Sequence, residues 1–152
     1  MEFKEFKTEI LRRAHETSAC QQEYKRAYAA ETLEDLIRVI KDNFTWCANH
    51  QVIDGPLLES VGNEVLNPFG LFVNCNVPEG GHLLLTGNSS AECYGNSSAV
   101  CFGNSSAECY GNSYVIAKNE RVVLEMHDNA VARVEPTNTL LVSKTSNITQ
   151  YE

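Results

Sequence analysis

The sequence predicts an α+β protein, with an N-terminal helical cap over residues 1–66 and a C-terminal β-solenoid of octapeptide repeats over residues 67–152. The main observation is a Gly-Asn pair that recurs every eight residues, at Gly87, Gly95, Gly103 and Gly111. Gly and Asn tolerate positive φ, so each pair predicts a turn. Self-similarity at a fixed short period is typical of solenoids. The second observation is the helical spacing of apolar residues before residue 66.

Four residues between successive turns alternate in character, as in Ala91-Glu92-Cys93-Tyr94 and Ala99-Val100-Cys101-Phe102. Alternation at period two predicts short strands with Ala and Cys facing a narrow core, and Glu or Val and then an aromatic facing outward. A disordered Gly/Asn/Ser linker is the alternative, but linkers have no inward face. The same spacing predicts strands near 83–86, 90–94, 98–102, 106–110, 114–118, 122–126, 130–135, 139–144 and 148–151. Asp128-Asn129 and Thr137-Asn138 are expected to be degenerate turns.

The number of strands in each rung stays open. Glu-Cys-Tyr recurs at sixteen residues, with Val-Cys-Phe between the two copies. Two strands per rung would stack Tyr94 on Tyr110 and Glu92 on Glu108, with Phe102 on the opposite wall. Three strands per rung would give a triangular coil and would avoid the repulsion between stacked glutamates.

Three helices are expected before the solenoid. Apolar residues mark one face of residues 3–17, and Ser18 is expected to cap a second helix over residues 19–30. Thr32 is the expected N-cap of a third helix that runs through Cys47, with Asp35 completing a capping box. A connector follows, in which Pro56 opens a short helix through Val61.

Both ends of a solenoid expose unpaired backbone groups and an apolar cross-section. The helical region is expected to cover the first rung, as terminal caps do in repeat proteins. At the other end, two alternatives remain. The polar segment 147–150 plugs the last rung, or a second copy of the chain pairs with it to form a homodimer.

Composition limits the classes of function. The chain has 152 residues with a net charge of −8, which disfavours direct binding to nucleic-acid phosphates. The first residues are charged and lack the apolar segment of a signal peptide, and no stretch is long enough to span a membrane, so a cytoplasmic location is expected. The six cysteines are then expected to be reduced, and no Cys or Cys/His spacing predicts a metal site.

No catalytic motif is recognisable, and the sequence predicts no enzyme and no cofactor. Glu125 is near His127, and a His-Glu dyad on neighbouring strands is a minor alternative. The outward aromatics, together with two glutamates, are the candidate partner-binding residues, unless the helices cover them. These candidates are Glu92, Tyr94, Phe102, Glu108, Tyr110 and Tyr114.

Two segments carry a resemblance, the front end ACQQEYKRAYAAETLEDLIRVIKDNFTWC with VIDGPLLES and the later run GNSSAECYGNS with DNAVARVE. Together they resemble small uncharacterised proteins of phages and mobile elements in gut Bacteroidetes, which have a short helical front and a tail of octapeptides. The resemblance implies a protein in the host bacterial cytoplasm that binds and inhibits a defence effector, as an anti-CRISPR protein does. The alternative is a homo-oligomeric scaffold or assembly accessory protein with no host target.

Overall fold

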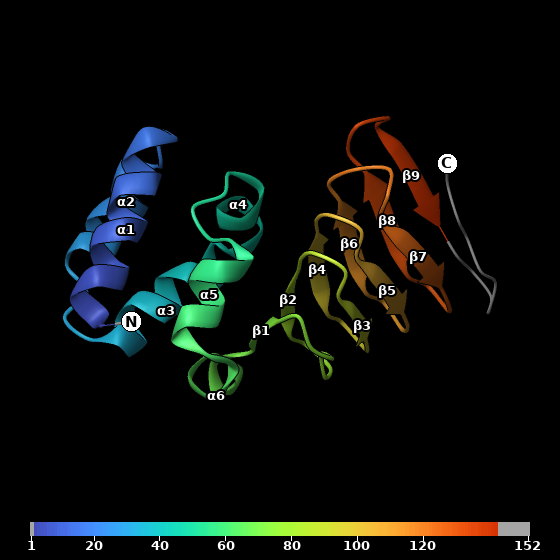
Figure 1. The fold of residues 1–152 in the computed structure, drawn as a ribbon, viewed down its shortest axis with the longest axis horizontal. Coiled ribbons are helices and arrows are strands. Elements are labelled where there is room, and N and C mark those ends of the chain that lie inside the picture. The colour runs from blue at the N-terminus through green and yellow to red at the C-terminus, as the bar shows by residue number, and fades with distance from the viewer. Residues whose placement is uncertain (1, 143–152) are drawn as a thin grey trace. The chain divides into compact units, whose positions relative to one another are not determined.

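The fold is described from a computed structural model, which describes residues 2–142. The chain divides into two compact units, Met1–Phe69 and Gly70–Glu152. The boundary falls after Phe69 rather than after residue 66, because a 3-10 turn, η1 (Asn67–Phe69), follows directly on the last helix. A helical region followed by a β-solenoid of about three turns confirms the predicted α+β class (Figure 1).

The first unit is entirely helical in its regular structure. Its helices are α1 (Phe3–Glu16), α2 (Gln21–Tyr28), α3 (Leu33–Asp42), α4 (Phe44–Asn49), α5 (Gly55–Val61) and α6 (Asn63–Leu66). The apolar stripes of α1 and α3 belong to the core of this unit, in which Phe6, Leu36 and Ile37 are almost fully buried. Burial of these stripes stabilises helices that are too short to form alone.

Helices α3 and α5 begin where the sequence predicted, whereas the predictions for the start of α2 and the end of α3 need correction. At the start of α3, Thr32 Oγ1 accepts a hydrogen bond from the Asp35 backbone N–H at 3.1 Å. At the start of α5, Asp54 Oδ1 accepts one from the Leu57 backbone N–H at 2.8 Å. Ser18 does not cap α2. It has a φ of 58° and ends α1 instead, as a residue in the left-handed conformation commonly does after a helix. The expected third helix also stops at Asp42, and α4 begins after the non-helical Asn43.

The second unit is a coil of short strands in two sheets (Figure 1). Sheet A has the order β1-β2-β4-β6-β8-β9 and sheet B has the order β3-β5-β7. The strands are β1 (Leu71–Val73), β2 (His82–Leu85), β3 (Ser90–Cys93), β4 (Ser98–Cys101), β5 (Ser106–Cys109), β6 (Tyr114–Ala117), β7 (Val123–Met126), β8 (Val131–Val134) and β9 (Thr139–Val142). From β2 to β8 successive strands alternate between the two sheets, so each of these rungs has two strands.

The register settles the choice between two and three strands per rung. Ser90 pairs with Ser106 and Ser98 pairs with Tyr114, both sixteen residues further on and both parallel. In the next rung the step is seventeen, because Ser106 pairs with Val123. The Gly-Asn turns have φ values of 62° to 67° at their glycines, and Asp128 and Asn138 adopt positive φ in the two predicted degenerate turns.

The inward positions carry the core, as the alternation predicted. Ala91, Cys93, Ala99, Cys101 and their later counterparts are buried at 5% exposure or less. The outward positions of the two sheets differ. In sheet A they hold Leu84, Val100 and Ile116, which are also buried, and then the exposed Arg133 on β8, whereas in sheet B they hold half-buried glutamates. Sheet B is therefore the sheet whose outward positions are acidic on all three strands.

The last described strand departs from the expected spacing. β9 pairs antiparallel with β8, with Val131 opposite Val142 and Val134 opposite Thr139. The tight turn at Glu135–Asn138, closed by a 3.1 Å hydrogen bond from Asn138 N–H to the Glu135 carbonyl, sends the chain back along sheet A instead of across to sheet B. The predicted strand 148–151 and the proposed plug 147–150 lie outside the described residues.

Candidate functional site

The outward face of sheet B brings together two columns of functional side chains. The acidic column consists of Glu92, Glu108 and Glu125, which are register partners on β3, β5 and β7. The aromatic column consists of Tyr94, Tyr110 and His127, which directly follow the last residues of the same strands. Both columns arise because the Glu-x-aromatic pattern returns once per rung on the same sheet.

The acidic column stacks like charges without a compensating cation. Parallel neighbours in a sheet lie about 4.8 Å apart, so each carboxylate has another one close by. All three glutamates are half-buried, and within residues 2–142 none of them forms an ion pair with Lys or Arg. Asn76 extends the column by one rung, where its Oδ1 accepts a 3.0 Å hydrogen bond from the Glu92 backbone N–H. Like charges placed directly opposite one another destabilise a sheet.

The aromatic column is a continuous stack of rings. The ring centroids of Tyr94 and Tyr110 are 5.2 Å apart with planes inclined by 9°, and those of Tyr110 and His127 are 4.6 Å apart with planes inclined by 6°. Tyr94 is 41% exposed, so this end of the stack presents an open aromatic surface. Stacking restrains each ring and therefore fixes the direction of its polar atoms.

Hydrogen bonds couple the two columns. Tyr110 Oη donates to Glu108 Oε2 at 2.5 Å. The carboxylate of Glu108 favours the protonated phenol and raises the pKa of Tyr110 to about 12. Glu92 raises the pKa of Tyr94 in the same direction, again chiefly through a side-chain hydrogen bond. Both phenols therefore stay protonated at neutral pH, and the hydroxyl of Tyr110 acts as the donor that orients the Glu108 carboxylate.

A shallow groove of about 410 Å³ runs over this face. The acidic column lines it, with Ser90, Ser106 and Val123 at the strand starts and Asn76 at one end. Hydroxyl, amide and carboxylate groups give the groove many acceptors and a negative charge. It suits a ligand that offers cationic or hydrogen-bond donor groups at short, regular intervals.

The predicted binding residues divide between the two sheets. Glu92, Tyr94, Glu108 and Tyr110 lie together on sheet B, as the two-strand alternative required. Phe102 follows β4 and Tyr114 begins β6, so both belong to sheet A. Phe102 therefore lies on the opposite wall from Tyr94 and Tyr110, as the two-strand alternative predicted, and Tyr114 lies on that wall too, because neighbouring octapeptides join different sheets.

Sequence reasoning missed Glu125 and His127 as members of this face. The signal was present as Glu125-Met126-His127, a degenerate copy of Glu-Cys-Tyr. It was hidden because the turn before β7 is one residue longer, which shifts the copy from the sixteen-residue spacing to seventeen.

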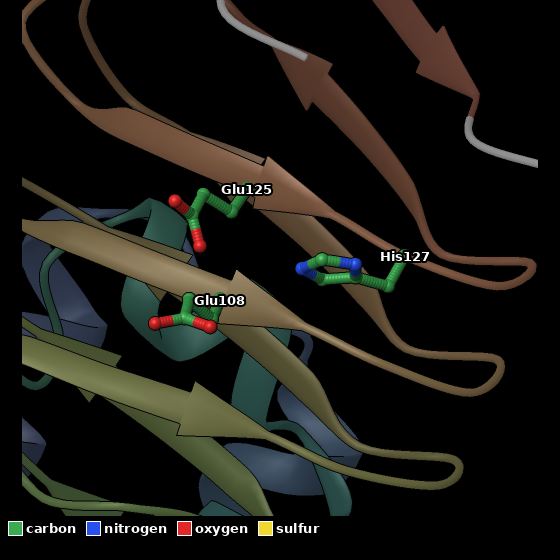
Figure 2. Close-up of side chains that lie close together, drawn as sticks. All are labelled: Glu108, Glu125 and His127. Atoms are coloured by element: carbon green, nitrogen blue, oxygen red, sulfur yellow. The ribbon is translucent and has the colours of Figure 1, made fainter. Parts of the chain in front are cut away.

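Three of these side chains could hold a metal ion. One ligand atom each from Glu108, Glu125 and His127 lies within 4.8 Å of the others. Figure 2 shows the two carboxylates on neighbouring strands, with the imidazole ring of His127 beside them and a ring nitrogen pointing to their side. Nε2 of His127 is buried and has no hydrogen-bond partner.

The cysteines do not add to the site. Cys93, Cys101 and Cys109 are buried inward residues. Desolvation raises the pKa of Cys101 well above the ordinary value, and a hydrogen bond with Cys93, together with desolvation, does the same for Cys109. Burial likewise raises the pKa of Cys47 to about 12. Thiols in such surroundings are inert packing groups.

Comparison of the chain with protein-family models, curated proteins and solved structures finds no match. The resemblance to proteins of phages and mobile elements accordingly stays a prediction. None of the helices described between residues 2 and 142 is both long enough and apolar enough to cross a membrane.

Proposed function

We propose that this protein is a non-catalytic binding protein that holds a basic segment of a protein partner on sheet B. The observation that carries the proposal is the acidic column, three stacked carboxylates that form no ion pair with Lys or Arg of residues 2–142, beside a stack of aromatic rings. Lysine or arginine side chains in the groove would relieve the repulsion within the column. Arginine would also stack on the open face of Tyr94.

Charge and geometry both support a basic partner over an acidic one. The whole chain has a net charge of −8, which steers cationic partners and repels nucleic acid. The carboxylates repeat at the spacing of the sheet, so an extended peptide can place successive basic side chains along the column. Tyr110 is restrained by stacking and by its hydrogen bond to Glu108, and Tyr94 is restrained by stacking on Tyr110, so both lose little entropy on binding.

The test is binding of a fluorescent arginine-rich decapeptide, measured by anisotropy in EDTA at several salt concentrations. We expect binding that weakens steeply with salt. Each of Glu92→Gln and Glu108→Gln should weaken it about threefold to fivefold, since a half-exposed ion pair contributes up to about 1 kcal/mol. Tyr94→Ala should weaken binding of the arginine peptide more than that of a lysine peptide.

The matched control is Glu59→Gln combined with Glu64→Gln, two exposed glutamates of the helical unit. This variant changes the net charge as much as the double variant of the acidic column. If it reduces peptide binding equally, the attraction is due to net charge and the proposed face is wrong. A neutral Ser/Asn peptide that binds as tightly as the arginine peptide would also contradict the proposal.

The finer proposal concerns the partner and rests on the resemblance described above. A basic surface that normally holds nucleic acid, such as that of a bacterial defence effector, has the charge that the acidic column requires. The protein would then inhibit the effector by blocking access of nucleic acid. The experiment is inhibition of a purified RNA-guided nuclease by the parent protein and by the Glu92→Gln, Glu108→Gln double variant. Loss of inhibition in the double variant alone supports this use, and inhibition by neither protein contradicts it.

A second candidate is a homo-oligomeric scaffold. The observation that favours it is the end strand β9, where Leu140 and Val142 are 61% and 51% exposed. Exposed apolar side chains on an edge strand promote pairing with another chain. In this alternative, a second copy pairs at the C-terminal end of the solenoid.

A further inference from the structure

The group formed by Glu108, Glu125 and His127 has features that the binding of a basic segment does not explain. Its three side chains come from β5, from β7 and from the residue that follows β7. They supply two carboxylates and one imidazole, and one ligand atom of each lies within 4.8 Å of the others. Binding of a basic peptide explains the two carboxylates, but it does not require a histidine nitrogen beside them.

The state of His127 Nε2 is the decisive observation. This atom is buried and unpartnered, and Figure 2 shows a ring nitrogen turned to the side of the two carboxylates. A buried polar atom without a hydrogen-bond partner costs about 1–3 kcal/mol, so its retention calls for an explanation. A ligand placed between the imidazole and the carboxylates would satisfy it.

We propose that Glu108, Glu125 and His127 form a binding site for a first-row divalent cation, with Zn²⁺ as the best fit. Zinc accepts both imidazole nitrogen and carboxylate oxygen at about 2.0–2.2 Å. Tetrahedral ligands at that radius are about 3.4 Å apart, which small rotations of the side chains can reach from the observed arrangement. Calcium and magnesium fit less well, because they prefer sites built almost entirely from oxygen.

The surroundings of the three ligands support this assignment. The Tyr110 hydroxyl donates a hydrogen bond to Glu108 Oε2, which leaves Oε1 available for the cation. The ring of Tyr110 also stacks on His127 with planes inclined by 6° and so restrains the imidazole. Partners that orient a ligand from behind commonly raise metal affinity ten- to hundredfold.

The negative charge of the two carboxylates also supports a cation site. Glu108 and Glu125 are register partners on adjacent parallel strands, and neither forms an ion pair within the described chain. A divalent cation would neutralise both carboxylates at once. With three protein ligands, the fourth position of the metal would remain open to water or to an exogenous ligand.

The test is titration of the full-length protein with Zn²⁺ by calorimetry, in a Cys20→Ser background that removes the exposed thiol. We expect one site. Glu125→Gln and His127→Phe should each weaken binding at least tenfold, and the phenyl ring keeps the stacking on Tyr110. Glu120→Gln, an exposed glutamate of the same unit, is the control and should bind Zn²⁺ like the parent.

Two readouts identify the ligands without mutation of the site. Co²⁺ as a probe should give a visible spectrum of oxygen and nitrogen ligands, without a thiolate charge-transfer band. The imidazole NMR signals of His127 should shift on addition of Zn²⁺, while those of His15 and His50 stay in place. Unchanged His127 signals at saturating Zn²⁺, or equal affinity in the parent, Glu125→Gln and His127→Phe proteins, would overturn the proposal. This site does not rest on peptide binding, which is measured in EDTA, so either proposal can fail alone.

Discussion

At the residue scale, the pair of Tyr110 and Glu108 shows how a side-chain hydrogen bond orients a carboxylate on the surface of sheet B. The carboxylate lies on β5 and the aromatic ring belongs to the residue directly after that strand, two positions further on, so both point to the same side of sheet B. The hydroxyl of Tyr110 lies 2.5 Å from Glu108 Oε2 and holds the carboxylate in place. A phenol that donates to a carboxylate is harder to ionise than a free one.

This pair makes a prediction about alkaline pH. In the folded chain the pKa of Tyr110 is about 12, against about 10 in an unfolded chain. Its contribution to stability is therefore complete below pH about 10 and is lost as the pH rises through about 12. Glu108→Gln should lower the pKa of Tyr110 towards 10, since the amide carries no charge. The measurement is the ultraviolet absorbance of tyrosinate, with Tyr110→Phe to assign the transition.

For this titration, Glu120→Gln is the control and should leave the curve of Tyr110 unchanged. An identical curve in the Glu108→Gln protein would show that the hydrogen bond between Tyr110 and Glu108 does not form in solution.

At the element scale, the turns of the solenoid stack as closely as the strands do. The Asn104 backbone N–H donates to the Gly87 carbonyl at 2.8 Å, one rung below. A Cβ atom at Gly103 would lie 2.9 Å from the Gly87 carbonyl oxygen, whereas a Cβ at Gly87 would meet nothing within 4 Å. Both glycines have nearly the same positive φ, 67° and 65°. Gly103 therefore requires glycine for two reasons, its positive φ and its close contact with the turn below, whereas Gly87 requires it only for its positive φ.

This difference predicts the outcome of a matched pair of substitutions. Gly87→Ala should cost about 1–2 kcal/mol, because alanine resists the left-handed conformation. Gly103→Ala should cost about 1–3 kcal/mol more, because the methyl group also pushes two turns apart. Urea unfolding followed by circular dichroism measures both free energies. Equal losses in the two variants would mean that the turns are not stacked as described.

The sequence analysis succeeded at this scale for a physical reason. A turn at positive φ and a strand that alternates small and large residues are local properties, so each octapeptide carries its own conformation. The helix starts at Thr32 and Asp54 are equally local. The prediction for Ser18 failed because the same residue type can begin one helix or end another, and the packing around α1 and α2 decides which.

At the scale of the whole molecule, the chain combines a helical unit with a solenoid whose last strand reverses direction. Antiparallel β9 covers the edge of β8 and leaves its own outer side chains exposed. Leu140 and Val142 are among the few large apolar residues of residues 2–142 that are exposed. They are the natural contact for a second copy, if the chain self-associates.

Self-association can be tested by sedimentation over a hundredfold range of protein concentration. The scaffold alternative predicts a dimer that dissociates on Leu140→Lys combined with Val142→Lys. Tyr28→Lys is the control, because Tyr28 is 67% exposed but belongs to the helical unit. A parent protein that stays monomeric over the whole range would contradict this alternative and leave the acidic column as the proposed interaction site.

The candidate site itself was predictable only in part. Glu92, Tyr94, Glu108 and Tyr110 follow from the sixteen-residue recurrence once two strands per rung are accepted. Phe102 and Tyr114 lie on the other sheet, and the sequence could assign them to a sheet only after the number of strands per rung was known, because one octapeptide carries no signal for the sheet that it joins. Glu125 and His127 were considered only as a possible dyad, and their place in the two columns was missed because one extra residue before β7 changes the spacing from sixteen to seventeen.

The sequence by itself determined the repeat unit, its turns, its inward Ala and Cys residues and the class of the fold. Only the tertiary structure decided the number of strands per rung, the face on which the carboxylates gather and the reversal of β9. The reason is physical. Dihedral preference and alternation act within eight residues, whereas the stacking of the repeats depends on hydrogen bonds between segments sixteen or seventeen residues apart, which the pattern of a single octapeptide does not encode.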